Sequence, residues 1–176
     1  MALKRIVRWW GLASIAGIMM LAGCANLSGT KVNTAHHLIS REGENAFATV
    51  YFLRPGTERP MGFADNALTV ELDGRELLTI AKGEYTLIYM RPRVRTTLTL
   101  ENLTQKGRSW RTQKMDTSYE FAFAAGQTYF ILLEPEDGEF RGVRFMAKNV
   151  DLFHAKEAAD KLRAVGVAKS APITTL

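Results

Sequence analysis

The chain has only one cysteine, Cys24, and three histidines among its 176 residues. A single thiol forms no intrachain disulfide and cannot build a cluster of thiolates around a metal. The histidines are His36, His37 and His154, and no Gly-x-Ser-x-Gly segment is present, so a hydrolytic triad has no support. The glycines form no phosphate-binding pattern. We therefore expect a chain that is not an enzyme and that holds no metal and no cofactor.

The sequence context of the three histidines gives no reason to assign them a metal-binding or catalytic role. His36 and His37 are adjacent and have no third ligand nearby in the sequence, so we expect both imidazoles to be solvated. His154 falls in the first turn of a predicted helix, which indicates a surface residue rather than a general base. An envelope enzyme or a metal-dependent protein is an alternative, but it needs converging His, Cys and carboxylate side chains. The sequence offers no such group.

The densest acidic stretch also lacks the spacing of a metal site. Its carboxylates do not follow the Asp-x-Asp-x-Asp-Gly order of a calcium loop. A charged hairpin turn that keeps a sheet edge from pairing accounts for them. The residues are Glu134, Glu136, Asp137 and Glu139.

Only one long apolar run is present, in residues 9–22. It is about 14 residues long, whereas a helix that crosses a bilayer needs about 20. Lys4, Arg5 and Arg8 precede it, and residues 1–23 contain no acidic side chain. This layout predicts a signal peptide that is removed on export. The remaining residues hold 20 basic and 18 acidic side chains, a balance that gives no argument for binding nucleic acid.

The apolar run ends in Leu21, Ala22, Gly23 and Cys24, which resembles the lipobox of bacterial lipoproteins. In that motif the signal is cut before the cysteine, here between Gly23 and Cys24, and the thiol is acylated. Several acyl chains hold a protein firmly, because each buried methylene contributes about 0.8 kcal/mol. Ala25 is not the aspartate that marks inner-membrane retention in enteric bacteria. We therefore expect a lipid anchor in the outer membrane, with the protein facing the periplasm or the cell surface.

Residues 24–45 and the rest of the chain differ in pattern. The first segment is mostly small and polar with no helical or strand period, so we predict a lipidated tether. Beyond it, short runs alternate apolar and polar positions and are separated by turn residues, as in strands. The clearest pair is 68–72 and 76–80, joined by Asp73 and Gly74, which suit a type I′ turn. Further strands are predicted at 48–53, 85–89, 96–100, 119–123, 129–133 and 142–147.

The end of the chain is helical in pattern. Asp151 suits an N-cap, apolar residues recur at near-helical spacing from Phe153 onward, and Gly166 suits the C′ position of a helix of about 14 residues. Residues 168–176 are predicted to be a flexible tail. We therefore predict that residues 46–167 form a mainly β domain. The expected fold is a small antiparallel β-sandwich, immunoglobulin-like or prealbumin-like, with one C-terminal helix.

Four sequence blocks follow one another along the predicted β domain. They are Tyr-Phe-Leu-Arg-Pro at 51–55, Val-Glu-Leu-Asp-Gly at 70–74, Lys-Gly-Glu-Tyr at 82–85 and Ala-Ala-Gly-Gln-Thr-Tyr-Phe at 124–130. In this order the blocks resemble the bacterial family known as domain of unknown function 2846. The resemblance covers residues 46–165 and implies a small β-sandwich on an envelope lipoprotein, with no assigned activity and no catalytic residues. The chain departs from the family at Arg91, Pro92 and Arg93, where a Pro-Gly turn is usual.

Two basic connections flank the predicted strand 96–100 and form a candidate surface for an anionic ligand. Consecutive loops on one strand emerge at opposite ends of a sandwich, so the two connections meet only if the longer one, 101–117, folds back. The alternative is a pair of solvated basic loops that aid solubility. The candidate residues are Arg91, Arg93, Arg95, Arg108, Trp110 and Arg111.

These features together favour a non-enzymatic binding or structural module of the cell envelope. Its expected partners are membrane lipid, through acylated Cys24, and either another envelope protein or an anionic lipid or glycan; nucleic acid is not expected. An alternative is an accessory subunit of a secretion or surface-appendage system, in which exposed strand edges would be the recognition device.

Overall fold

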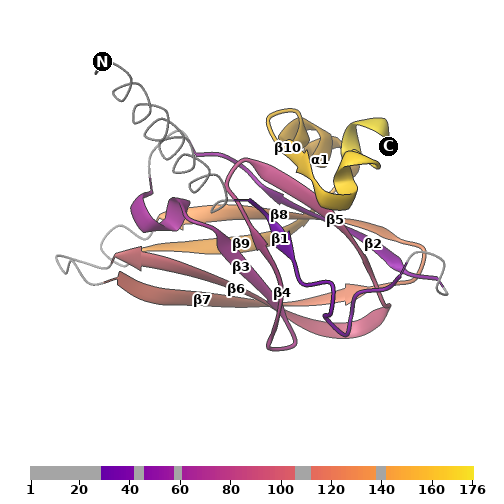
Figure 1. The fold of residues 1–176 in the computed structure, drawn as a ribbon, viewed down its shortest axis with the longest axis horizontal. Coiled ribbons are helices and arrows are strands. Elements are labelled where there is room, and N and C mark those ends of the chain that lie inside the picture. Colours follow the sequence, from indigo (N-terminus) through magenta and orange to yellow (C-terminus); the bar gives the residue numbers. More distant parts are fainter. Residues whose placement is uncertain (1–28, 42–45, 58–60, 106–111, 138–141) are drawn as a thin grey trace, which may run out of the picture.

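The computed structural model describes residues 29–41, 46–57, 61–105, 112–137 and 142–176. Within these residues, two five-stranded sheets face each other (Figure 1). Sheet A has the strand order β1-β4-β3-β6-β7, and sheet B has the order β10-β5-β2-β8-β9. Helix α1 and the C-terminal residues lie on the outer side of sheet B. The predicted β-sandwich with one helix near the C-terminus is confirmed.

The elements have the following bounds. Sheet A contains β1 (Lys31–Val32), β3 (Leu68–Leu72), β4 (Arg75–Ile80), β6 (Arg93–Gln105) and β7 (Thr112–Phe123). Sheet B contains β2 (Ala48–Arg54), β5 (Glu84–Met90), β8 (Thr128–Asp137), β9 (Val143–Val150) and β10 (Arg163–Val165). The helical elements are α1 (Leu152–Ala159) and the 3-10 turns η1 (Gly62–Asp65), η3 (Gly166–Lys169) and η4 (Ile173–Thr175).

Strands β3 and β4 form the hairpin that the sequence predicts. Asp73 and Gly74 have φ angles of 49° and 74°, and a type I′ turn requires positive φ at both positions. The Asp73 carboxylate also accepts hydrogen bonds from the Thr96 hydroxyl and the Thr97 amide, each at 2.9 Å. The turn is therefore fixed to the neighbouring strand β6.

The strand directions in sheet B differ from the antiparallel prediction. Strand β2 pairs in parallel with β8, and β10 pairs in parallel with β5. Parallel neighbours need a crossover connection, because the chain must return to the same end of the sheet. Between β2 and β8 the chain passes through β3 and β4 of sheet A, returns to sheet B as β5, and then passes through β6 and β7 of sheet A. Alternation of apolar and polar residues predicts that a segment is a strand, but it does not predict which strands pair or in which direction.

Strands β6 and β7 run much further than the sequence predicts. The stretch 101–117, predicted to be a polar connection, belongs mostly to these two strands. Asn102 and Thr104 occupy core-facing positions of β6 and are buried. The Asn102 amide donates to the Val143 carbonyl at 3.0 Å, and the Val143 amide donates to the Thr104 hydroxyl at 3.0 Å. These bonds to β9 satisfy the buried polar groups and allow polar residues at inward positions.

The acidic stretch is also mainly strand rather than a turn. Glu134 and Glu136 lie within β8, opposite the antiparallel strand β9. Glu134 pairs with Lys148 at 2.8 Å, and Glu136 pairs with Arg144. The predicted charged turn is therefore wrong for these two residues, because cross-strand basic partners stabilise them in the ladder. It is also wrong for Asp137, the last residue of β8, which lies opposite Val143. Glu139 lies outside the described residues.

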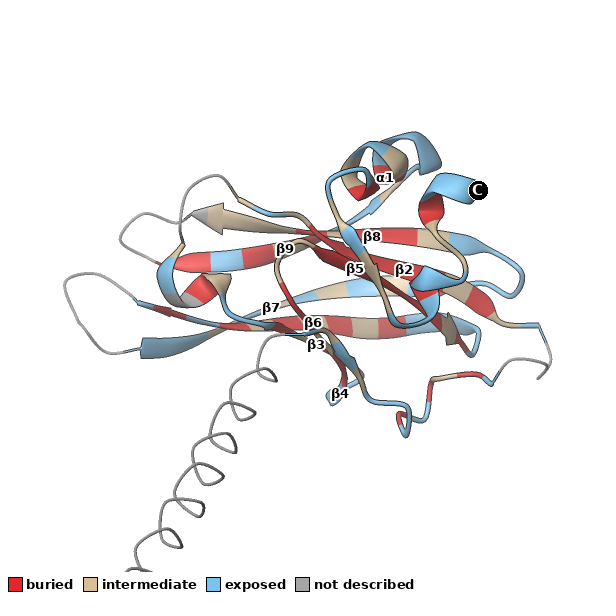
Figure 2. Ribbon diagram, turned by 45° about the horizontal axis from the view of Figure 1, so that its top comes forward, coloured by how far each residue is buried: buried red, intermediate tan, exposed pale blue. Residues whose placement is uncertain are grey.

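Strand β2 is buried on both faces, which explains its continuous apolar sequence. Val50 and Phe52 point into the core between the sheets, whereas Tyr51 and Leu53 point to the outer side of sheet B. Figure 2 shows buried residues running along β2, β5 and β8 beneath α1. The sandwich therefore has a main core between its sheets and a second core under the C-terminal segment.

The C-terminal segment corrects two predictions. Asp151 caps α1 as predicted, and its carboxylate accepts from the His154 amide at 2.9 Å. The helix ends at Ala159, however, and the chain continues into β10, so Gly166 does not end the helix. The predicted flexible tail is also wrong, because Ile173 is fully buried in the second core.

The predicted tether, residues 24–45, is wrong for residues 30–41. Strand β1 pairs with β4, and Leu38 is buried in the main core. The Ser40 amide donates to the Tyr89 carbonyl at 2.8 Å, and the Arg91 amide donates to the Leu38 carbonyl at 2.8 Å. Residues 30–41 therefore belong to the domain. Their few apolar side chains pack against distant strands. These side chains do not recur at helical or strand spacing, so the sequence gives no sign that they are buried.

Replacing Ile173 by alanine tests whether the last residues support the fold. Loss of a fully buried isoleucine side chain typically costs about 2–5 kcal/mol in the free energy of unfolding. We expect Ile173→Ala to lower the midpoint of thermal unfolding, measured by circular dichroism, by about 5–15 °C. Leu176→Ala is the matched control, because Leu176 is 54% exposed. Equal midpoints for the two variants would contradict the docked C-terminal segment.

Candidate functional site

Two charged side chains are buried at one end of the sandwich, where β2 ends and β5 begins. Arg54 is 1% exposed and Glu84 is 3% exposed. They occupy opposite positions in the register of β2 and β5. The Gly83 amide donates to the Arg54 carbonyl at 3.0 Å and closes this end of the ladder. We call this region, with η1 and the turn from β4 to β5, the Glu84 end of the sandwich.

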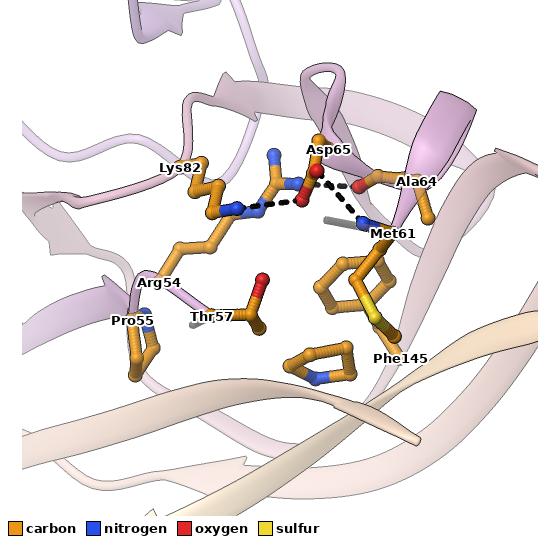
Figure 3. Close-up of a pocket in the computed structure, with 9 residues that line it drawn as sticks. Arg54, Pro55, Thr57, Met61, Ala64, Asp65, Lys82 and Phe145 are labelled. Carbon is orange, nitrogen blue, oxygen red and sulfur yellow. Dashed lines mark hydrogen bonds and ion pairs between the residues drawn. The ribbon is translucent and has the colours of Figure 1, made fainter. Parts of the chain in front are cut away.

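Arg54 points into the main core because it continues the alternation of Val50 and Phe52 along β2. One guanidinium nitrogen donates to the Ile80 carbonyl at 2.8 Å, and another donates to the Ala64 carbonyl at 2.7 Å. The guanidinium carbon lies 5.0 Å from the centre of the Phe145 ring, a cation–π distance. Figure 3 shows the guanidinium beside Asp65 and Ala64, which belong to η1. Arg54 therefore attaches η1 to the end of the core.

The charge of Arg54 is only weakly compensated. Burial lowers the pKa of Arg54 to about 10, and the nearby Asp65 carboxylate opposes this shift. Asp65 itself accepts from Lys82 at 2.8 Å and from the Met61 amide at 2.8 Å. The hydrogen bond from Lys82 holds the pKa of Asp65 below its ordinary value. Arg54 is therefore a cation at neutral pH, held mainly by carbonyl oxygens and an aromatic ring.

The hollow beside Arg54 is small. It holds about 180 Å³ of empty space, including open solvent at its mouth. Almost none of this space is wide enough to enclose a water molecule, whereas pockets for small ligands usually enclose about 300–1,000 Å³. Its lining includes Arg54, Asp65 and Lys82, whose drawn bonds join one another and the protein backbone (Figure 3). The hollow thus offers charged groups that are engaged in structural contacts.

Glu84 joins three segments that are distant in the sequence. Its carboxylate accepts from the Thr30 amide at 3.0 Å and from the Thr30 hydroxyl at 2.5 Å. The other carboxylate oxygen accepts from the Arg163 guanidinium of β10. Burial disfavours the charged carboxylate, but the bonds from Thr30 and Arg163 outweigh burial and hold the pKa of Glu84 below its ordinary value. The buried anion therefore fastens both the N-terminal and the C-terminal segments to sheet B.

The described residues do not gather the predicted basic surface. Arg91, Arg93 and Arg95 are exposed around the start of β6, and Arg95 pairs with Glu120. Gln105, at the other end of β6, lies about 33 Å from Arg95 because a strand rises about 3.3 Å per residue. Arg108, Trp110 and Arg111 lie outside the described residues. A shared anionic-ligand surface stays a prediction.

One histidine is buried, and the other two, His37 and His154, are exposed, which for His37 agrees with the prediction. His36 is buried, which corrects the solvated prediction, and its Nδ1 accepts from the Leu38 amide at 3.1 Å. Its ring stacks on that of His37 with centroids 4.6 Å apart, and burial lowers the pKa of His36. His154 is exposed at the start of α1, as predicted. In the described ranges, no three His, Cys or acidic side chains lie close enough to hold a metal ion.

The proposed anchor cannot be placed, because Leu21, Ala22, Gly23 and Cys24 lie outside the described residues. None of the helices that the structure describes has the length and apolar character needed to span a bilayer. The chain matches no model of a known protein family and no curated protein. The site must therefore be interpreted from its own geometry.

Sequence reasoning missed both buried charges of the Glu84 end. Arg54 directly follows the apolar residues Tyr51, Phe52 and Leu53, at a position that the strand alternation directs into the core. Charged residues are rarely buried without partners, so a charge at this position indicates a special environment. Glu84 gave a weaker signal, since it adjoins the glycine turn before β5. Its partners lie 54 and 79 residues away. No local pattern points to them.

Substitution of Arg54 tests its structural role. Arg54→Ala removes the donors to the Ile80 and Ala64 carbonyls and leaves unfilled space in the core. Truncation of large buried side chains and loss of buried hydrogen bonds each destabilise, so we expect a loss of about 3–5 kcal/mol. Chemical denaturation with urea measures it. Lys82→Ala is the control and should cost less than about 1 kcal/mol, because its ion pair is partly exposed. An unchanged free energy of unfolding in Arg54→Ala would contradict this structural role.

Acid titration tests the role of Glu84. A carboxyl whose pKa is lowered on folding adds stability above its unfolded pKa of about 4.3, and this stability is lost as the pH falls through the folded pKa. We expect Glu84→Gln to destabilise the protein at pH 7 and to differ less from wild type as the pH approaches 3. Urea denaturation across this range measures the difference. Glu157→Gln, on the exposed side of α1, is the control; a parallel pH response of the two variants would refute the role.

Proposed function

We propose that this chain is an envelope lipoprotein that holds its β-sandwich at a membrane as a non-enzymatic binding or structural module. Residues 1–23 are removed in this proposal, and Cys24 becomes the acylated N-terminus. The observation that carries the proposal is the lipobox-like sequence of Leu21, Ala22, Gly23 and Cys24 at the end of a basic and then apolar leader. The anchor is membrane lipid bound through the acyl groups of Cys24.

The proposed anchor lies close to the folded domain. Thr30 is bonded to Glu84, and six peptide units separate it from Cys24. Six residues span at most about 20 Å even when fully extended. The lipid therefore holds the Glu84 end next to the membrane surface, and the opposite end of the sandwich points away from it. A short connection of this kind presents the domain in a restricted orientation.

The contacts at the Glu84 end support a structural rather than a catalytic role. Arg54 donates to backbone carbonyls, Glu84 accepts from Thr30 and Arg163, and Asp65 accepts from Lys82. Each of these hydrogen bonds connects two segments of the chain and so stabilises the fold.

The outer membrane is the proposed destination, because Ala25 follows the cysteine in place of a retention aspartate. The protein then faces the periplasm or the cell surface. Partners at the exposed end are another envelope protein or an anionic lipid or glycan. Arg91, Arg93 and Arg95 lie at that end and are accessible to such a ligand.

Replacing Cys24 tests the anchor directly. Cys24→Ser removes the thiol that acylation requires, so we expect no incorporation of labelled palmitate and an accumulation of uncut precursor. Ala25→Ser is the matched control, because it introduces the same side chain one residue later and retains the thiol. Palmitate labelling of Cys24→Ser at the wild-type level would reject the proposal. Separation of the two membranes should then place the labelled wild-type protein with outer-membrane markers.

A further inference from the structure

Strand β7 forms a long free edge of sheet A. The strand has 12 residues and pairs with β6 on one side, and no described strand pairs with it on the other side. The opposite edge of the sheet is covered by β1, which has only 2 residues. Figure 1 shows β7 as the outermost strand of its layer. A free edge of this length presents a row of backbone donors and acceptors to a partner strand.

Strand β7 lacks several devices that block edge pairing. It contains no proline, and its register with β6 is continuous from Thr112 to Phe121. Its inward-facing side chains include Met115, Tyr119 and Phe121, which are only half-buried. Proteins usually blunt free edges with proline, bulges, inward-pointing charges or charged side chains on the edge. The charged residues of β7 are Lys114, Asp116 and Glu120, and all three are exposed. This edge is nonetheless suited to receive a strand and to bury the half-exposed apolar side chains.

We propose that β7 pairs antiparallel with β7 of a second copy of this chain, about a two-fold axis at Thr117. The two sheets A then become one continuous sheet of two copies, and the interface is the same on both sides. This pairing adds a strand to an exposed edge, a common mode of protein recognition. It is independent of the lipid anchor, since it depends only on the sequence and geometry of β7.

The charges along β7 select this register. With the axis at Thr117, Lys114 of each copy lies opposite Glu120 of the other, and Met115 lies opposite Tyr119. Opposite charges directly across a strand pair are stabilising, and symmetry provides the contact twice. The pairing also covers residues 112–122, nearly the whole strand. Lys114 and Glu120 already neutralise Glu101 and Arg95 within the chain, so the interface forms a connected charge network.

Neighbouring registers are less favourable. An axis at Ser118 gives similar overlap but places Asp116 opposite Glu120, and an axis at Asp116 places that carboxylate opposite itself. Like charges directly opposite each other are destabilising. The free edge of β9 is also a poorer choice, because it carries Arg144 and Lys148 but no acidic residue. Charge complementarity therefore favours β7 over β9 and Thr117 over its neighbours.

Cysteine cross-linking of the full-length chain tests this register. In the proposed pair, Thr117 lies opposite itself, and directly opposed Cα atoms are about 4.5–5.5 Å apart, within the range of a disulfide. We expect Thr117→Cys to form a covalent dimer on mild oxidation. Thr112→Cys is the matched control on the same strand, because its two copies lie about 33 Å apart. The wild-type chain reports any cross-link through Cys24.

The outcomes separate the proposal from its alternatives. About tenfold more covalent dimer for Thr117→Cys than for Thr112→Cys supports the register, given the disulfide geometry. Equal cross-linking of the two variants indicates random collision or another register and overturns the proposal. An absence of covalent dimer for Thr117→Cys above the wild-type level also overturns it.

A charge exchange tests the Lys114–Glu120 contact within the Thr117→Cys background. Lys114→Glu places two carboxylates opposite each other twice, so the protein concentration for half-maximal cross-linking should rise about tenfold. Adding Glu120→Lys restores opposite charges between copies while leaving like charges against Glu101 and Arg95 within each copy. Recovery in the double variant is therefore specific to the interface. If the double variant stays as weak as Lys114→Glu while both fold by circular dichroism, the proposed register is wrong.

Discussion

The buried carboxylate of Glu84 is the contact on which the arrangement of the chain depends. It accepts from Thr30 at the start of the described chain and from Arg163 in the strand that follows α1. Without the carboxylate, the Thr30 amide, the Thr30 hydroxyl and the Arg163 guanidinium would lose this acceptor. Burial of a carboxylate is costly unless several donors surround it. The position of Glu84 therefore requires all three segments to be present together.

Arg54 imposes a complementary requirement on the same end of the sandwich. Its guanidinium needs several acceptors, and the carbonyls of Ile80 and Ala64 provide two of them. The polypeptide from β2 to η1 must therefore turn back over the core, and the end of β4 must lie beside it. Opposite charges at paired positions of β2 and β5 thus organise two different sets of loops. Apolar residues at these positions would bury equally well but would not specify which loops pack there.

The sequence predicts this fold well wherever local pattern and final environment agree. Residues 68–72 alternate strictly and form β3 with the predicted bounds, because one side faces the core and the other faces solvent. Prediction fails where distant groups change the environment of a residue. Asn102 and Thr104 look like loop residues but are inward-facing strand residues bonded to Val143. Phe153 looks like a core residue of a helix and is 74% exposed.

The candidate site shows the same limit more strongly. The lipobox-like sequence is contiguous, so one sequence is enough to propose an anchor at Cys24. Arg54 lies in the block Tyr-Phe-Leu-Arg-Pro, but nothing near it in the sequence identifies the carbonyls that accept its hydrogen bonds. Residues 30–41 appeared to be a tether because their bonds reach β4 and β5 rather than each other. Local sequence patterns therefore do not predict the contacts between segments that are far apart in the chain.

The burial of Ile173 against the outer face of sheet B has a consequence for the order of events during synthesis. A ribosome releases the chain from its N-terminus, so β2, β5 and β8 emerge well before the residues that cover their outer face. Until residue 173 is free, Tyr51, Leu53 and Phe130 have no cover from η4. The apolar surface of a nascent chain is a site for chaperone binding and for aggregation. Protection by a chaperone therefore matters most in the interval before the last residues are released.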